Sequence, residues 1–468
     1  MSLYSGSMTL KSYNPFTGKI IAEIPETGLN TLEDILVLGK KSQLSWSMLT
    51  LEERSVKLER LPKLIKEQIS QIVDVLVEEA GMPISEAKSS TTKLLDRIKF
   101  LTAKCPKFLK DEEINLKDDQ VNKVIYQPVG TVAAIMPWNH PFMIPFWTFV
   151  PALIAGNNVV YKPSELTPLI GKEIEQIFSN LGLPVGLFST VYGDGKMGRY
   201  LSSAAKVNMV SFAGSVRVGI NIYQEAAGNM KRLILENGGK DALVVGYCKD
   251  NEKVAEQILL GFLRHAGQLC SSVRRVYIVE DQYNQYLELL KNKITSFKVG
   301  DPKDEDTVVG PLKSEWQVNT LDSQVEDALS KGGSIAYQGR ERFRQVYPPT
   351  MIRDAVPGMN VVDQETFGPL LPVICVRNLQ EAATCVNQSS FGLNASIWHD
   401  NLDEAVELAS KIDVGTVSIN MLPGTHNYCT WHGVKMSGIG NILSPEGVCQ
   451  FTNRKNVRYY NEADDEPK

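Results

Sequence analysis

The chain has 468 residues, a formal net charge of −5, 22% charged residues and 43% hydrophobic residues. This length predicts two or three domains, and the composition is typical of a globular protein. Lysines and arginines are scattered rather than gathered into one basic surface, so nucleic acid is not expected as a partner. The longest apolar stretch, residues 142–155, holds Pro145 and Pro151 and is too short for a membrane span, so it predicts a buried helix.

The cysteines argue against a disulfide framework and against a metal site. There are seven of them, an odd number, and they are dispersed along the chain. Neither a CxxC nor an HExxH motif is present, so no metal is expected. The first ten residues lack the charged and apolar regions of a secretory signal. Together these features predict a cytoplasmic location, where thiols stay reduced.

In chain order, residues 31–106 predict helices, because apolar residues recur at helical spacing from Leu51 to Ile72 and on to Glu79. Residues 114–126 alternate apolar and polar side chains around Asp118 and Asp119, which predicts a polar hairpin. Such an arm has free strand edges and often pairs with a partner chain.

Strand and helix patterns then alternate twice. The first series predicts strands at 131–136, 158–162, 188–192 and 209–212. The second predicts a helix at 252–263 and strands at 242–245, 276–279, 371–376 and 415–420. Short apolar strands separated by helices are typical of doubly wound parallel sheets. We therefore predict an α/β protein with two such sheets and a small β arm.

Two residues suggest covalent catalysis through sulfur. Cys270 ends the run Gly-Gln-Leu-Cys, has little apolar sequence around it, and would gain thiolate stabilisation at the start of a helix. Glu236 precedes Asn-Gly-Gly, whose glycines leave a carboxylate free to act as a mobile general base. Taken alone, Cys270 equally fits a buried small apolar residue, and Glu236 a surface carboxylate.

Polar groups also follow several predicted strands. Asn139, after the strand that ends at Met136, has the amide that an oxyanion site needs, or forms a turn before Pro141. Lys162 and Glu165 have the spacing to bond a ribose, although an exposed pair with a helix N-cap at Ser164 explains them as well.

A Gly-Ser turn, Gly214-Ser215, opens a predicted helix and suits a pyrophosphate, but an ordinary strand-to-helix turn fits it equally. The turn from Glu365 through Phe367 says little by itself.

In this order, these motifs resemble the aldehyde dehydrogenase superfamily. The similarity runs from the motif Tyr-Asn-Pro-Phe-Thr-Gly at residues 13–18 to about Val457, nearly the whole chain. The resemblance implies an NAD(P)-binding domain (9–107 and 127–239), a catalytic domain (240–440), and an arm with a C-terminal strand (108–126 and 453–468). It also implies a homodimer or homotetramer.

The resemblance further implies residue roles. Cys270 matches the nucleophile, Glu236 the general base, and Asn139 the oxyanion-holding amide. The implied cofactor contacts are Trp138, Lys162, Ser164, Glu165, Gly214, Ser215, Glu365 and Phe367. The implied reaction oxidises an aldehyde to a carboxylic acid through a thiohemiacetal and a thioester, with NAD(P) reduced.

Four departures from the family pattern stand near these motifs. The family usually has Asn at His265, Leu at Asn237, Gly at His432, and often Arg-Glu-Gly at residues 441–443. None of these differences removes a catalytic group. For His265 a buried packing role is favoured over proton transfer.

The residues implied to line the substrate tunnel favour an apolar or aromatic aldehyde. Trp147 stands where semialdehyde enzymes tend to have Arg, and Phe142 and Trp431 would extend the same wall. Arg264 instead favours a substrate with a carboxylate, because it resembles a carboxylate-binding position of semialdehyde enzymes. A salt bridge at the end of a helix also explains it. Succinate semialdehyde or a small hydroxyaldehyde is therefore the second choice.

Glu165 should repel the 2′-phosphate of NADP, so NAD is favoured, with NADP possible. A CoA-acylating reaction would not need Glu236, which argues for hydrolysis. Two further hypotheses are a cofactor-free thiol hydrolase, which leaves the Lys162–Glu165 pair unexplained, and a homologue that has lost turnover.

Overall fold

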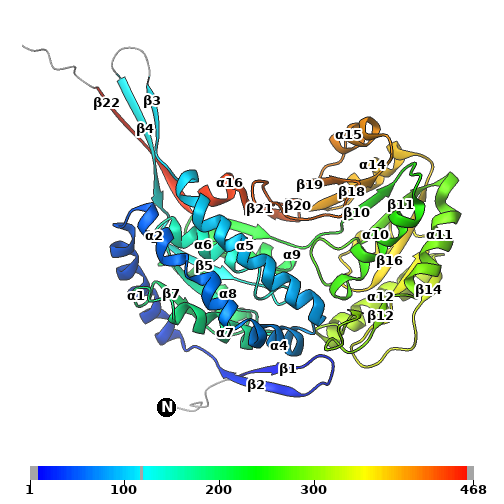
Figure 1. Cartoon of the computed structure of the whole chain (residues 1–468), viewed down its shortest axis with the longest axis horizontal. Helices are drawn as coiled ribbons and strands as arrows, with labels where there is room; N and C mark the ends of the chain where they lie inside the picture. Colours follow the sequence, from blue (N-terminus) through cyan, green and yellow to red (C-terminus); the bar gives the residue numbers. More distant parts are fainter. Residues whose placement is uncertain (1–8, 116–119, 461–468) are drawn as a thin grey trace, which may run out of the picture.

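The computed structural model describes residues 9–115 and 120–460. Two α/β lobes lie side by side, and a narrow β arm projects from the first lobe (Figure 1). The fold predicted from the sequence is confirmed: each lobe is built on a mainly parallel sheet, with one antiparallel edge strand that the sequence did not reveal. Among the described residues, no helix is both long and apolar enough to cross a bilayer.

The N-terminal part of the first lobe is helical, as predicted. Its helices are α1 (Leu29–Ser47), α2 (Leu51–Leu58), α3 (Leu61–Glu67), α4 (Ile69–Ala80) and α5 (Ile84–Phe108). The stretch from Leu51 to Glu79 forms three helices, not the single one that its periodicity predicts. Thr50 and Glu53 form a capping box that starts α2, and Pro62, which has no N–H to donate, sits in the first turn of α3.

The first-lobe sheet has the order β21-β9-β8-β5-β6-β7, with β21 antiparallel and the other five strands parallel. The strands are β5 (Thr131–Ile135), β6 (Asn158–Lys162), β7 (Phe188–Thr190), β8 (Met209–Ala213), β9 (Arg232–Glu236) and β21 (Gly438–Ile439). The helices between them are α6 (Phe146–Ile154), α7 (Pro168–Ser179), α8 (Gly195–Ser203) and α9 (Val216–Ala227).

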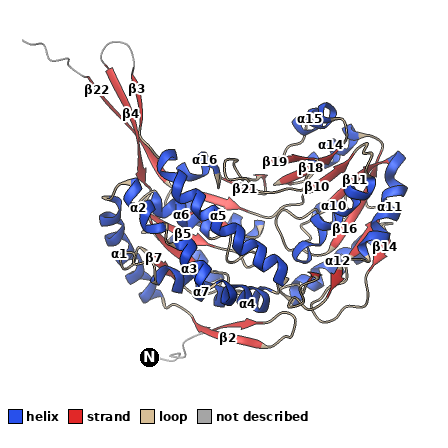
Figure 2. Ribbon diagram, viewed as in Figure 1, coloured by secondary structure: helices blue, strands red, loops and turns tan. Residues whose placement is uncertain are grey.

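Both faces of this sheet are covered, as Figure 2 shows. Val132 and Ala134 of β5 belong to one apolar core cluster, whereas Ala133 and Ile135 belong to another. Because successive strand residues point to opposite faces, the uninterrupted apolar run of β5 reflects burial on both sides.

The second-lobe sheet has the order β14-β15-β16-β11-β10-β18-β19, with only β14 antiparallel. The strands are β10 (Ala242–Val245), β11 (Arg275–Val279), β14 (Ser334–Gln338), β15 (Thr350–Arg353), β16 (Leu370–Val376), β18 (Asn394–Trp398) and β19 (Thr416–Ile419). The helices are α10 (Asn251–Leu263), α11 (Glu280–Ile294), α12 (Glu315–Ser330), α13 (Asn360–Asp363), α14 (Leu379–Asn387) and α15 (Leu402–Ser410).

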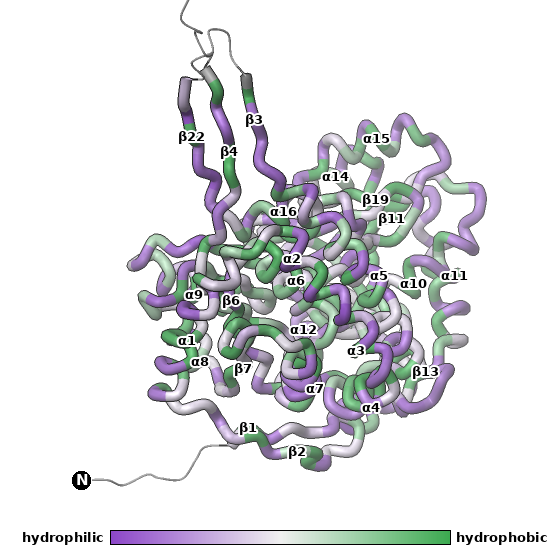
Figure 3. Tube along the Cα trace, turned by 60° about the vertical axis from the view of Figure 1, so that its left-hand side comes forward, coloured by the Kyte–Doolittle hydropathy of each residue, from purple (hydrophilic) through white to green (hydrophobic). Residues whose placement is uncertain are grey.

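The arm is a three-stranded antiparallel sheet of order β22-β4-β3. Its strands are β3 (Glu112–Asn115), β4 (Gln120–Pro128) and β22 (Thr452–Tyr460). The predicted hairpin is therefore present, although its expected turn at Asp118 and Asp119 lies outside the described residues. Figure 3 shows the three strands standing clear of both lobes, with hydrophilic and hydrophobic residues mixed along them.

Short elements complete the chain. They are β1 (Thr9–Tyr13) paired with β2 (Ile20–Pro25), β12 (Lys298–Val299) with β13 (Thr307–Val309), β17 (Phe391–Gly392) with β20 (Val434–Lys435), and α16 (Ser444–Cys449).

A buried carboxylate, Glu79, joins three of these elements. Its oxygens accept hydrogen bonds from Ser12 Oγ of β1 (2.5 Å) and from the backbone N–H groups of Leu169 and Ile170 in the first turn of α7 (both 2.8 Å). These N–H groups have no partner within the helix, so Glu79 satisfies donors that would otherwise be buried unpaired.

We predict that Glu79→Ala lowers the free energy of unfolding by about 2–4 kcal/mol, because it leaves several buried hydrogen-bond donors without an acceptor. Urea unfolding would measure the change. Glu78→Ala is the matched control, since Glu78 is partly exposed and makes a surface ion pair with Lys303, which should contribute below about 1 kcal/mol. Equal losses in the two variants would contradict this role for Glu79.

Candidate active site

Three residues far apart in the sequence meet between the two lobes. Asn139 follows the carboxyl end of β5, Glu236 is the last residue of β9, and Cys270 lies in the turn before β11. The Asn139 amide Nδ2 donates a hydrogen bond to the Gln268 carbonyl oxygen (3.0 Å), two residues before the cysteine. The negative charge of Glu236 also acts on the thiol of Cys270. The structure therefore brings the three predicted catalytic residues together.

The loop before Cys270 has an unusual backbone. His265, Ala266 and Gly267 have φ values of 49°, 53° and 70°, so three consecutive residues are left-handed. Only glycine fits the third position, because a Cβ there would lie 2.5 Å from the Gly368 carbonyl oxygen. Non-glycine residues in this region store strain that the surrounding contacts must offset.

Gln268 supplies the contacts that fix this loop. Its side chain is fully buried and donates from Nε2 to the carbonyl oxygens of Pro311 (3.2 Å) and His265 (3.3 Å). Its Oε1 accepts from the Lys313 backbone N–H (2.9 Å). The sequence motif included Gln268, but gave no sign of this anchoring role, which depends on a segment more than forty residues away.

Cys270 is more enclosed than its sequence suggests. It lies in a turn and not at the start of a helix, and its half-buried side chain packs against the apolar core of the first lobe. Burial raises the pKa of its thiol to about 12, and the carboxyl groups of Asp241 and Glu236 add to the rise, while Arg274 opposes it. The expected helix-dipole stabilisation of the thiolate was wrong, because the helical turn precedes this cysteine.

Glu236 is a buried carboxyl group, and almost no neighbouring group compensates for the loss of water around it. Neither of its oxygens has a hydrogen-bond partner of normal geometry. Burial raises the pKa of Glu236 well above its usual value, and the neighbouring Trp431 indole offsets only part of this rise. Antiparallel pairing of Glu236 with Gly438 of β21 fixes its backbone. A carboxyl with a raised pKa is suited to exchange protons above the usual carboxyl range.

An unpredicted cationic residue, Arg274, lies near Cys270. Its Nη2 donates to the Leu269 carbonyl oxygen (2.5 Å), and its guanidinium lies 5.1 Å from the ring centre of Phe367. Its positive charge opposes the rise in the pKa of Glu365, a rise that burial causes. The only sequence signal was an Arg-Arg pair ahead of β11, which does not distinguish a buried residue from an exposed one.

The predicted nicotinamide-side residues form one group. Glu365 accepts a hydrogen bond from the Gly239 backbone N–H (3.2 Å), and Gly238 leaves room for it, since a Cβ there would lie 2.2 Å from its carboxylate. Phe367 has a left-handed φ of 50° and packs edge-on against Trp138, with ring centres 5.5 Å apart.

The predicted nucleotide-side residues form a second group. The Lys162 ammonium is buried at the end of β6 and lies 3.3 Å from the carboxylate of Glu165, which is 46% exposed. Ser164 accepts a hydrogen bond from the Leu166 backbone N–H (3.2 Å) and does not cap α7, which begins four residues later, so that alternative was wrong.

Gly214 and Ser215 lead into α9. Ser215 caps this helix by accepting from the Val218 backbone N–H (3.5 Å). Gly214 has no room for a side chain, because a Cβ would lie 2.5 Å from the Phe212 ring. A buried ammonium, an exposed carboxylate and a helix N-terminus match what the ribose and phosphate groups of a dinucleotide require, so the residues present fit this cofactor.

The four substrate-side candidates lie in different surroundings. Trp147 is buried on α6, and Trp431 is buried beside Glu236. Phe142 packs against Phe146 within the core (5.5 Å between ring centres). Arg264 forms an ion pair with Glu86 through Nη2 (2.7 Å), so its charge is already compensated.

The unusual residues near the site are accommodated by packing. His265 is buried against His140, with ring centres 6.0 Å apart, and burial lowers the pKa of its imidazole to about 3. This neutral ring fits the packing role favoured from the sequence. The Asn237 amide donates to the Met436 carbonyl oxygen (3.1 Å), which ties the residue after Glu236 to the strand region near β21.

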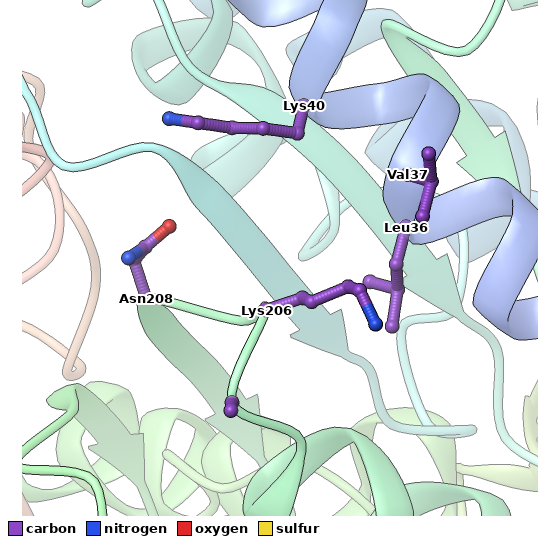
Figure 4. Close-up of a pocket in the computed structure, with 6 residues that line it drawn as sticks. Leu36, Val37, Lys40, Lys206 and Asn208 are labelled. Atoms are coloured by element: carbon purple, nitrogen blue, oxygen red, sulfur yellow. The ribbon is translucent and has the colours of Figure 1, made fainter.

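Another hollow, of about 350 Å³, lies elsewhere on the molecule. It is lined by Leu36, Val37, Lys40, Ala205, Lys206 and Asn208, as Figure 4 shows. None of these residues belongs to the catalytic or cofactor groups, so the hollow plays no part in the site.

Fold and site together define a two-lobed α/β protein in which a half-buried cysteine lies near a side-chain amide and a buried carboxyl group. Residues 4–457 match the Aldehyde dehydrogenase family. The chain belongs to this family.

Individual relatives are similar to this protein over nearly the whole of its sequence. A succinate-semialdehyde dehydrogenase (NADP(+)) of Deinococcus radiodurans is 29% identical over 96% of this chain and 94% of its own. A 4,4'-diapolycopene aldehyde oxidase of Methylomonas is 31% identical over 95% of this chain and 84% of its own. The solved structure of lactaldehyde dehydrogenase from Escherichia coli superposes with a TM-score of 0.94, at 29% identity over 98% of this chain and 97% of that one.

The carboxyl group of Glu236 generates a prediction about stability. A folded-state pKa above the unfolded one favours folding while the group is protonated, and this contribution is lost as pH rises toward the folded pKa. Glu236→Gln removes the titration. The stability of this variant relative to the natural protein should therefore increase as pH rises above the usual carboxyl range, by at most about 1.4 kcal/mol per pH unit.

Urea unfolding across this pH range would measure the effect. Glu407→Gln is the control, because Glu407 is exposed and its pKa is lowered by hydrogen bonding to Lys411. The stability of Glu407→Gln relative to the natural protein should not increase with pH. If the stability of Glu236→Gln relative to the natural protein were independent of pH, the assignment of Glu236 as a buried acid would be contradicted.

Proposed function

We propose that this protein oxidises an aldehyde to its carboxylic acid with reduction of NAD(P), through a covalent intermediate on Cys270. The observation that carries the proposal is the convergence of Cys270, Asn139 and Glu236 between the lobes. A homologue that has lost turnover is not supported, since each group that the chemistry needs is present and enclosed.

Attack by the Cys270 thiolate on the aldehyde carbon begins the reaction. The raised pKa of the thiol means that its proton must pass to a base as the cysteine attacks or beforehand, and the carboxylate of Glu236 or of Asp241, whose charges act on the thiol, would accept it. The Asn139 amide and the Cys270 backbone N–H can then donate to the oxygen of the thiohemiacetal. For this the Asn139 Nδ2 keeps one N–H free besides the one it donates to Gln268.

Bound NAD(P) would supply the hydride acceptor. Glu365 with Phe367 would hold its nicotinamide half, and Lys162 with Glu165 its adenosine ribose. Collapse of the thiohemiacetal leaves a thioester on Cys270. Glu236, once deprotonated, takes a proton from a water molecule that attacks this thioester, and the carboxylic acid is released.

The exposed carboxylate of Glu165 supports NAD over NADP, because it stands beside the Lys162 ammonium and would meet a 2′-phosphate with like charge. We assign NAD(P) binding to residues 9–107 and 127–239 and catalysis to residues 240–440. For the carbon body of the substrate we propose an apolar or aromatic group, which the indole rings of Trp147 and Trp431 would accept.

The arm supports assembly into a homodimer or homotetramer, because the outer strands β3 and β22 of its sheet each offer an edge for pairing. All seven cysteines are free thiols, which supports a cytoplasmic location.

We predict that Cys270→Ala abolishes aldehyde oxidation and leaves NAD binding intact. Absorbance of reduced nicotinamide, followed on a panel of aldehydes with NAD and with NADP, would measure activity, and fluorescence titration would measure binding. Cys375→Ala is the control, since Cys375 is an exposed thiol in the second lobe and should keep full activity. Reduction of NAD by Cys270→Ala would refute the covalent mechanism. A natural protein inactive on every aldehyde would refute the activity.

We predict that Glu236→Gln mainly slows release of the acid. Stopped-flow mixing should show a burst of reduced nicotinamide followed by a steady rate about 100-fold or more below that of the natural protein. In the natural protein the steady rate should rise with pH above the usual carboxyl range, because the base acts only when deprotonated and burial raises its pKa. An unchanged steady rate in the variant, at a pH where acid release limits turnover, would contradict this role.

A further inference from the structure

Arg274 is a buried cation four residues after Cys270, and none of the proposed reaction steps uses it. Its side chain is 1% exposed. Its Nη2 donates to the Leu269 carbonyl oxygen (2.5 Å), whereas its Nε and Nη1 are buried and have no hydrogen-bond partner among the described residues. Hydrogen bonds therefore compensate little of the cost of burying this charge, and negative groups nearby must supply the rest.

Contacts on several sides fix the position of this guanidinium. The acceptor of its hydrogen bond, Leu269, is the residue directly before Cys270. On another side, the guanidinium lies 5.1 Å from the ring centre of Phe367. The backbone N–H of Arg274 donates to the Asp241 carbonyl oxygen (2.9 Å), which fixes the start of the side chain as well. Arg274 thus joins the turn that carries the cysteine to the turn on the proposed nicotinamide side.

The charged groups that act on the Cys270 thiol come from several elements. Burial is the main cause of its raised pKa, and the carboxyl groups of Asp241, Glu236 and Glu365 raise this pKa further. Arg274 alone among these four charged residues lowers it. The interaction is mutual, because the charge of Cys270 in turn favours the protonated form of the guanidinium.

A second buried cation, Lys240, does not offer the same stabilisation. Burial lowers the pKa of Lys240 well below its usual value, and the charges of Arg274 and Arg275 lower it further. Its Nζ donates to Thr366 Oγ1 (2.5 Å). An arginine keeps its charge under burial that neutralises a lysine, so Arg274 is the residue that holds a permanent positive charge near the sulfur.

We propose that Arg274 is a positioning residue, whose fixed positive charge near the Cys270 turn makes the thiol lose its proton more readily and stabilises the sulfur anion that attacks the aldehyde. This inference rests on the proposed aldehyde oxidation. When the thiol proton passes to the carboxylate of Glu236 or Asp241, the negative charge moves to sulfur. The guanidinium stabilises that charge through space, without contact with the substrate, and its effect is larger than in water because the surroundings are of low polarity.

The test measures the reactivity of the sulfur without aldehyde or cofactor. Iodoacetamide reacts with the thiolate, which displaces iodide and forms a C–S bond, and mass spectrometry of the peptide that contains Cys270 gives the rate. Cys270 is half-buried, so a reagent of this size can reach it. Arg274→Gln removes the charge but keeps an N–H donor for the Leu269 carbonyl oxygen.

At neutral pH, alkylation of Cys270 should be about 3- to 10-fold slower in Arg274→Gln than in the natural protein. Loss of a nearby opposite charge raises the pKa of the thiol and lowers the thiolate fraction, and the greater nucleophilicity of a more basic sulfur offsets part of this loss. Arg274→Lys, which can still carry a positive charge, should recover part of the rate. Arg274→Met is the second neutral variant, for the case that Arg274→Gln does not fold.

Two controls accompany these variants. Arg275→Gln is the matched change, because Arg275 is also buried but donates to the Lys240 carbonyl oxygen (2.9 Å) and to Tyr277 Oη (3.1 Å). It should change the rate at Cys270 by less than about 2-fold. The exposed thiol of Cys375 should react at the same rate in every protein, which checks the reagent.

A kinetic measurement connects this charge to turnover. With an aldehyde that the natural protein oxidises, kcat/KM at neutral pH should fall in Arg274→Gln by about the same factor as alkylation, and Arg274→Lys should recover part of it.

The outcomes separate this inference from the proposed function. Equal rates of Cys270 alkylation in the natural protein and in both neutral variants would overturn the role of Arg274. Equal slowing in Arg274→Lys and Arg274→Gln, or in Arg275→Gln and Arg274→Gln, would overturn it too, because the loss would then not follow the charge at this position. Alkylation that depends on Arg274 in a protein that oxidises no aldehyde would overturn the proposed function alone.

Discussion

One hydrogen bond, from the Asn139 amide to the Gln268 carbonyl oxygen, connects the first-lobe sheet to the loop that carries Cys270. The donor follows a strand of the first sheet, and the acceptor belongs to the loop that enters the second. Gln268 continues the connection, because its side chain bonds to the backbone at Pro311 and Lys313. The left-handed turn just before it would not persist without such contacts. The geometry at Cys270 therefore depends on contacts within the second lobe as well as on the hydrogen bond to the first.

Enclosure at this interface sets the electrostatics of the site. Burial raises the pKa of Glu236, of Cys270 and of Asp241, the last to about 7, and lowers that of Lys240. All four shifts favour neutral forms, as expected where water is replaced by a medium of low polarity. In the proposed reaction, this enclosure would limit the access of water to a thioester on Cys270 and favour a water molecule that Glu236 activates. Protection of the intermediate and proton exchange by a buried acid would then have one cause.

Near the proposed substrate site, tertiary contacts reverse what two residues predict when each is considered by itself. Trp147 by itself predicts an apolar wall, yet the guanidinium of Arg97 lies over its ring. Arg264 by itself predicts a carboxylate site, yet Glu86 neutralises it. In both cases the residue that reverses the interpretation comes from α5, which is remote in sequence. The electrostatic surroundings of Trp147 and Arg264 therefore depend on contacts from α5, and not on these two residues alone.

The sequence by itself determined the class of fold and predicted which groups react. Continuous apolar runs predicted β5 and β6, because these strands are buried on both faces, and the order of short motifs singled out Cys270, Glu236 and Asn139. Only the tertiary structure decided the antiparallel return of β21 to the first sheet, the turn conformation at Cys270 and the partners of Arg97 and Arg264. Local patterns report on neighbours a few residues apart, whereas these contacts join segments tens to hundreds of residues apart, whose approach is set by the packing of whole helices and sheets.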